Sequence, residues 1–84
     1  MPRPVRKAVE WYVGELRRRF PSVQTQVMPE AMGGFDVWIR VAGPEDRELE
    51  LVDATAELAG KSLDQFDVSI LATVVNALDG AEVS

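Results

Sequence analysis

Apolar and polar residues alternate with two different periods along the chain. In residues 4–20 the apolar positions recur at steps of three and four, as one face of an α-helix requires. These positions are Val5, Val9, Tyr12, Val13, Leu16 and Phe20. Pro21 follows, and the residue before a proline avoids helical backbone, so the helix should end at Phe20. The first predicted element is therefore an amphipathic helix over residues 4–20.

The next two segments, residues 22–28 and 35–41, alternate with period two, which is typical of strands that bury one face. One predicted face carries Val23, Thr25, Val27, Phe35, Val37, Ile39 and Val41, and the opposite face carries Gln24, Gln26, Met28, Asp36, Trp38 and Arg40. Gly33 and Gly34 lie between the segments, where a hairpin turn needs glycine. The pattern predicts an antiparallel hairpin.

A proline followed by two acidic residues within residues 43–46 is typical of a helix start. We expect this helix to run to about Gly60 or Leu63. One side would carry Leu51, Thr55, Leu58 and Ser62, with Val52, Ala59 and Leu63 beside them. Residues 63–67 are interpreted as a connector. Residues 68–75 are nearly all apolar or small, which is typical of a strand flanked or covered on both sides.

The predicted order is helix, strand, strand, helix, strand. A helix that joins the second and third strands implies a right-handed crossover. The pattern thus predicts an α+β fold, with two helices packed on one face of a three-stranded mixed sheet. Residues 1–84 would form a single domain with its core over about 4–76 and a loose tail over 77–84. The strand order stays open, as does the choice between Ser69, Leu71, Thr73, Val75 and their neighbours for the polar face.

Composition narrows the possible chemistry. The chain has no histidine and no cysteine, which excludes disulfides, thiolate zinc sites, cysteine nucleophiles and histidine bases. No catalytic, metal or cofactor site can be assigned, so we expect no enzyme activity and no cofactor. The longest uncharged run, residues 68–78, is shorter than the roughly 18 residues of a membrane span. A cytoplasmic protein without membrane contact is expected.

Trp38 is the most informative residue of the predicted open sheet face. Tryptophan and arginine are enriched at interface hot spots, and a sheet face that is bare and partly apolar is usually covered. We expect a homodimer, or a complex with another protein, joined through this face or a sheet edge. The candidate interface residues are Trp38, Arg40, Asp36, Gln24, Gln26 and Met28. Cover by the chain's own tail is the alternative.

Positive charge gathers in the first 19 residues, although the formal net charge of the chain is −5. The basic residues there are Arg3, Arg6, Lys7, Arg17, Arg18 and Arg19. Cations at a helix C-terminus complement its dipole, which explains the arginine run without a ligand. The alternative function is nucleic-acid binding by these residues, with Trp11 stacking on a base. A steep loss of oligonucleotide affinity with salt would support it.

The acidic pairs Asp53–Glu57 and Asp64–Asp67 match no calcium loop, and we interpret Asp53 and Glu57 as part of a solvated face. The element order and residues 33–41 loosely resemble the N-terminal core of minimal nucleotidyltransferases. That resemblance implies that Asp36 stands at one metal-binding aspartate, while Trp38 replaces the second, giving a catalytically dead domain. The order is also similar to a type II KH domain that lacks one helix and the Gly-x-x-Gly nucleic-acid loop.

Overall fold

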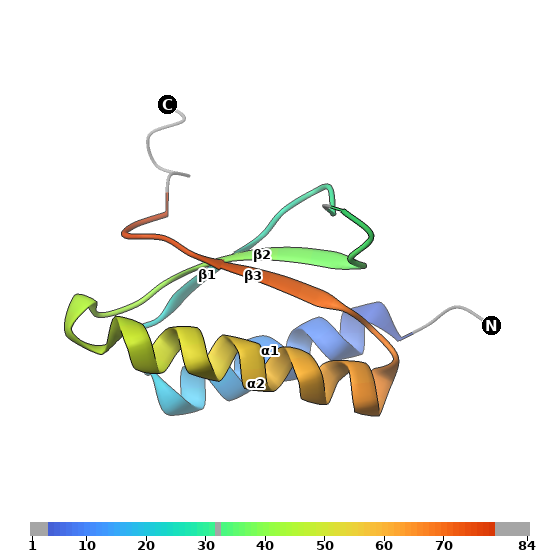
Figure 1. The fold of residues 1–84 in the computed structure, drawn as a ribbon, viewed down its shortest axis with the longest axis horizontal. Helices are drawn as coiled ribbons and strands as arrows, with labels where there is room; N and C mark the ends of the chain where they lie inside the picture. The colour runs from blue at the N-terminus through green and yellow to red at the C-terminus, as the bar shows by residue number, and fades with distance from the viewer. Residues whose placement is uncertain (1–3, 32, 79–84) are drawn as a thin grey trace.

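The structure, a computed structural model, describes residues 4–31 and 33–78. Its elements are α1 (Val5–Arg19), β1 (Gln24–Val27), β2 (Val37–Ala42), the short 3₁₀ helix η1 (Glu45–Arg47), α2 (Glu48–Phe66) and β3 (Ile70–Val74). The predicted α+β class and element order are confirmed. Both helices lie on the same face of the sheet (Figure 1).

The strand order is β1-β2-β3, with β2 in the centre. β1 pairs antiparallel with β2, and β3 pairs parallel with β2 after the chain has crossed over through α2. The register places Gln26 opposite Arg40 and Trp38 opposite Leu71. Partners in register point to the same side of a sheet, so the polar residues of the hairpin share a face with the odd-numbered residues of β3.

Two connections depend on glycine. Gly33 and Gly34 in the hairpin turn have φ values of +49° and +84°, a backbone region that residues with a Cβ rarely adopt. At Gly43, which leads from β2 to η1, an added Cβ would lie 2.7 Å from Cδ2 of Leu51. The first pair allows the chain to reverse, and Gly43 allows α2 to approach the end of β2.

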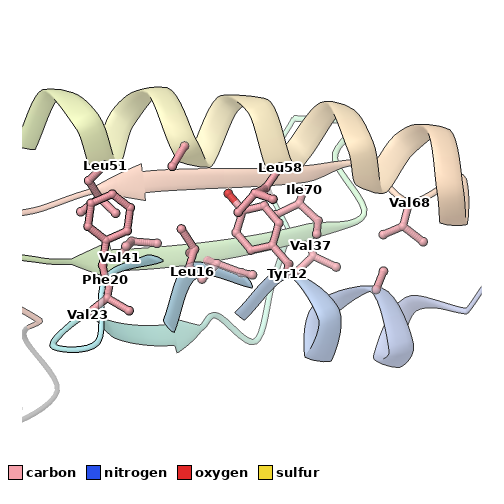
Figure 2. Close-up of a cluster of buried hydrophobic side chains, with 13 residues drawn as sticks. Tyr12, Leu16, Phe20, Val23, Val37, Val41, Leu51, Leu58, Val68 and Ile70 are labelled. Carbon is pink, nitrogen blue, oxygen red and sulfur yellow. The ribbon is translucent and has the colours of Figure 1, made fainter. Parts of the chain in front are cut away.

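The core lies between the helix layer and the sheet (Figure 2). Its buried side chains include Ala8, Tyr12, Leu16, Phe20, Val23, Val37, Ile39, Val41, Leu51, Ala54, Leu58, Val68 and Ile70. Each large aliphatic side chain removed from water stabilises the fold by about 1.5–3 kcal/mol. The hydroxyl of Tyr12 donates a hydrogen bond of 2.9 Å to the carbonyl oxygen of Thr55, which joins α1 to α2. Burial raises the pKa of Tyr12 above its usual range.

The prediction of a connector over residues 63–67 was wrong, because α2 continues to Phe66. The helix ends at Asp67, which has left-handed backbone (φ 57°) and donates its N–H to the carbonyl of Leu63. The hydroxyl of Ser62 donates to the carbonyl of Val68 at 2.9 Å and holds the turn into β3. These contacts, which the local pattern does not reveal, set the end of the helix. Of the predicted tail, residues 79–84 lie outside the described residues.

The strands are shorter than predicted, and two residues of the expected buried face are exposed. Val27 and Phe35 are 50% and 40% exposed. Both lie towards the hairpin turn, which rises away from the helix layer in Figure 1. The helices therefore cover the middle of the sheet and leave this end of the hairpin in solvent.

Candidate protein-interaction surfaces

The structure gathers the predicted interface residues on one face of the sheet, which we call the open sheet face. Gln24, Gln26, Met28, Asp36, Trp38 and Arg40 alternate with the hairpin residues of the opposite face, and Leu71 and Thr73 join them from β3. Both helices lie on the opposite face (Figure 1). Of the two alternatives left open for the third strand, the one with Leu71 and Thr73 is therefore correct.

The indole of Trp38 lies across the two parallel strands. It is half-buried, and its Nε1–H donates a hydrogen bond of 3.0 Å to Oγ1 of Thr73. Leu71 is its partner in register on β3, and the N–H of Met28 donates to the carbonyl of Trp38. Because the polar atom of the indole is satisfied inside the fold, the surface of the ring that remains is apolar and held in one orientation.

Asp36 joins the starts of two strands. Its carboxylate accepts hydrogen bonds from the N–H of Ser69 at 2.9 Å and from the Ser69 hydroxyl at 3.1 Å. Its own N–H donates to the carbonyl of Ser69. The carboxylate that the nucleotidyltransferase resemblance assigns to a metal thus has a structural role, which is to anchor the beginning of β3 to β2. Within residues 4–31 and 33–78, no group of three or more acidic side chains could hold a metal ion.

The predicted basic cluster is partly engaged in ion pairs. Arg18 bonds Glu15 on its own helix at 2.6 Å, and Arg19 pairs with Glu57 of α2 at 3.4 Å. Arg6, Lys7 and Arg17 are exposed, and Arg3 lies outside the described residues. Nucleic-acid binding by these residues stays a prediction, with two of its arginines bonded to carboxylates of the protein itself.

Glu57 also pairs with Lys61 at 3.2 Å. The hydrogen bond from Arg19, followed by that from Lys61, lowers the pKa of the Glu57 carboxyl. The interpretation of this acid as simply solvated was therefore incomplete, because it joins α2 to the C-terminal end of α1.

Trp11, which lies off the main apolar stripe of α1, contacts an aromatic residue of α2. Its ring packs against that of Phe66, at the end of α2, with 5.7 Å between the ring centroids. This side chain is partly buried against the core. Its partner lies 55 positions further along the chain, so no local pattern could have revealed the contact. Trp11 therefore joins the two helices, and its stacking on a base stays a prediction.

A second apolar surface, which the sequence pattern did not predict, lies on α2. Leu49, Val52 and Leu63 are 82%, 43% and 52% exposed, although we expected Val52 and Leu63 beside the buried positions. Together with Ala56 and Ala59 they form what we call the outer stripe of α2. The signal was present as a second set of apolar residues at steps of three and four, shifted from the buried set.

The outer stripe borders a groove along the edge of the sheet. Val52, Thr55, Ala56 and Ala59 from α2 and Ile70, Leu71 and Ala72 from β3 line this groove. Exposed large aliphatic side chains beside a groove of this composition are typical of an interaction surface and are unusual on a solvated helix face.

Comparison with known proteins found no match to a protein-family model, a curated protein or a solved structure. The two family resemblances therefore stay predictions from element order. In the part of the chain that the structure describes, no helix has the length and apolar character needed to cross a bilayer.

Proposed function

We propose that this chain is a small non-enzymatic protein-interaction module that self-associates through the open sheet face around Trp38. The observation that supports this most is the fixed indole, bonded to Thr73 and opposite Leu71, on a face that neither helix covers. A rigid aromatic ring that loses no hydrogen bond on burial is a favourable interface anchor.

A second observation on the same face agrees with the proposal. The Oε1 atom of Gln26 is buried and accepts no hydrogen bond from the residues that the structure describes. A buried acceptor without a donor costs about 1–3 kcal/mol. A donor brought by a second chain, with a small rotation of the amide, would remove that cost.

Three of the ionisable groups are bonded within the fold, which supports binding over catalysis at those residues. Asp36 and Glu57 are bonded to other residues of the fold, and Tyr12 is buried with its hydroxyl bonded to a carbonyl. A catalytic acid or base needs a polar atom free to meet a substrate. The expectation of a cytoplasmic setting belongs to the same proposal and rests on the lack of cysteine.

The size of the face sets the expected affinity. Three strands with the length of β2 cover about 20 by 14 Å. Stable interfaces bury roughly 800 Å² on each partner, so the flanking loops must contribute, and we expect a weak dimer whose population depends on concentration.

The test is solution mass by light scattering over a range of concentrations, at low and high salt. We expect the wild type to become dimeric as concentration rises, Trp38→Ala to stay monomeric, and the matched variant Leu49→Ala, which truncates an exposed residue off the face, to behave as wild type. Circular dichroism checks that both variants are folded. A wild type that stays monomeric at every concentration would refute self-association.

A further inference from the structure

We infer that the outer edge of β3, beneath the outer stripe of α2, binds an extended segment of a partner protein as a fourth strand. The segment would carry apolar residues at alternate positions and lysine or arginine at its ends. This site lies at the side of the sheet, apart from the open sheet face. It therefore goes beyond the proposed self-association and does not depend on it.

The backbone of β3 presents the groups that such a strand needs. Val37 donates its N–H to the carbonyl of Ser69, and Val75 donates its N–H to the carbonyl of Val41. In a parallel pair, alternate residues bond to the neighbouring strand, so the N–H and C=O groups of Ile70, Ala72 and Val74 point away from β2. Among the described residues, no strand pairs with this edge.

The edge also lacks the usual protection against strand addition. Natural edge strands carry lysine, proline, inward-pointing charges or bulges, which discourage pairing with another chain. Residues 70–74 include no charged residue and no proline, and they pair with β2 in unbroken register. An apolar edge of this kind is a template for pairing.

The helix layer is wider than the sheet beneath it. Two helices, each about 10 Å across, span about 20 Å. Three strands at the usual spacing span about 14 Å, so the helices can cover roughly one more strand. Of the strands, α2 packs most closely on β3, the edge strand, and the two lie together at the front of the molecule in Figure 1. The additional width therefore falls at the outer edge of β3, where the outer stripe is exposed.

The same geometry opposes a second copy of this chain as the occupant. Edge-to-edge pairing of two β3 strands would bring each α2 within about one strand spacing, roughly 5 Å, of its counterpart. Packed helices need about 8–10 Å between their axes. An extended segment brings no helix of its own, so it fits at this edge, where the α2 helix of a second copy would collide with α2.

The side chains around the groove define the chemistry of the segment. Val52, Ala56, Ala59 and Leu63 can cover every second side chain of an added strand. Glu45 and Glu48 lie beside Val74 and Val75 at one end of the edge. Residues 45–67 contain eight acidic and two basic residues. An apolar segment with basic ends therefore matches the groove in polarity and charge.

The test uses a blocked synthetic peptide, Lys-Lys-Val-Thr-Val-Thr-Val-Lys-Lys, titrated into the ¹⁵N-labelled full chain. We expect the amides of Ile70, Ala72 and Val74 to exchange rapidly with solvent in the free protein. On peptide binding they should gain protection by about tenfold or more, because they become hydrogen-bonded. A peptide with proline in place of the central valine should not bind, and one with glutamate in place of lysine should bind more weakly.

Matched variants locate the site. Val52→Lys places a charge in the groove and should weaken peptide binding by about tenfold or more, whereas Val27→Lys, at a similarly exposed valine beside the other edge, should change it by less than about twofold. Ala72→Pro removes an outward N–H and should abolish binding while the sheet is retained. Trp38→Ala should bind as wild type, which separates this inference from the proposed function.

Four results would overturn the inference. They are amides of Ile70, Ala72 and Val74 that are already protected in the free chain, peptide binding that survives Val52→Lys, peptide-induced chemical-shift changes confined to the open sheet face, and no binding at millimolar peptide. If the wild type is an oligomer and the Val52→Lys variant has a different oligomer mass, this edge would instead be assigned to a second copy of the chain.

Discussion

The two edge strands of the sheet, β1 and β3, differ in length, in the polarity of their residues and in the charge of the helix beside them. β1 is four residues long, three of them polar, and lies between Pro21 and Pro29. β3 is a longer strand made of aliphatic residues and one threonine. Beside β1 lies the basic helix α1, and beside β3 lies the acidic helix α2.

The difference shows that strand position alone does not decide how an edge behaves. The short length of β1 and the prolines near both of its ends discourage another chain from pairing with it, whereas β3 is one residue longer and has no proline near it in the sequence. The same fold thus has one edge that is protected against strand addition and one that is receptive to it. About five residues in each edge strand make the difference. Changes to each edge can sharpen or break this contrast.

Truncation of one aliphatic residue in each edge strand gives the largest expected effect. Ile70→Ala should reduce the free energy of unfolding by about 2–5 kcal/mol, because Ile70 is buried beneath α2 and its loss leaves a cavity. Val27→Ala, at a half-exposed residue, should cost less than about 1 kcal/mol. Urea unfolding measures both, and equal losses would contradict the contrast between the edges.

Removal of the Asp36 carboxylate should have an intermediate effect. Asp36→Ala deletes two hydrogen bonds that anchor β3, at a cost of about 1–3 kcal/mol. Asp53→Ala, at an exposed acid of α2, is the control and should change stability by about 0.5 kcal/mol or less. Two results together would favour the nucleotidyltransferase resemblance. Asp36→Ala would be as stable as wild type, and it would lose a Mg²⁺-dependent response to nucleotide that the wild type shows.

The contact between the basic and acidic helices should give the smallest effect. The lowered pKa of Glu57 means that its pairing with Arg19 stabilises the fold above the unfolded pKa, about 4.3, and that this contribution is lost as pH falls through the folded pKa. Glu57→Gln should therefore be slightly less stable than wild type at pH 7, and the two should converge in acid. Thermal unfolding between pH 7 and 3 measures the difference in stability between the two proteins. A difference that stays constant across that range would show that the ion pair does not cause it.

Most of the fold could be predicted because its periodic patterns are local. The three- and four-residue steps of α1 and the alternation around Trp38 assign helix and strand faces without any tertiary information. The end of α2 could not be predicted, because it depends on the left-handed backbone of Asp67 and on the bond from Ser62 to Val68.

The candidate sites show the same division. The open sheet face follows from alternation, so Trp38, Gln26 and Arg40 could be placed together from the sequence. The outer stripe of α2 could not, because this helix has two apolar stripes and only the position of β3 decides which one is buried. Asp36 could be placed on the same face as Trp38, but its bond to Ser69, 33 positions away, could not be predicted, since the strand order was open.

The route of the chain through α2 also determines when each edge can form during folding. Nine residues separate β1 from β2, whereas twenty-seven separate β2 from β3. Closing the longer loop costs about 1 kcal/mol more in conformational entropy. The contacts of the parallel pair can offset that cost only after α2 has formed. We therefore expect the hairpin to assemble early and β3 to dock late. Until β3 docks, the edge of β2 that faces away from β1 has no partner strand, so the central strand stays exposed for longest on the side where the mature sheet is receptive.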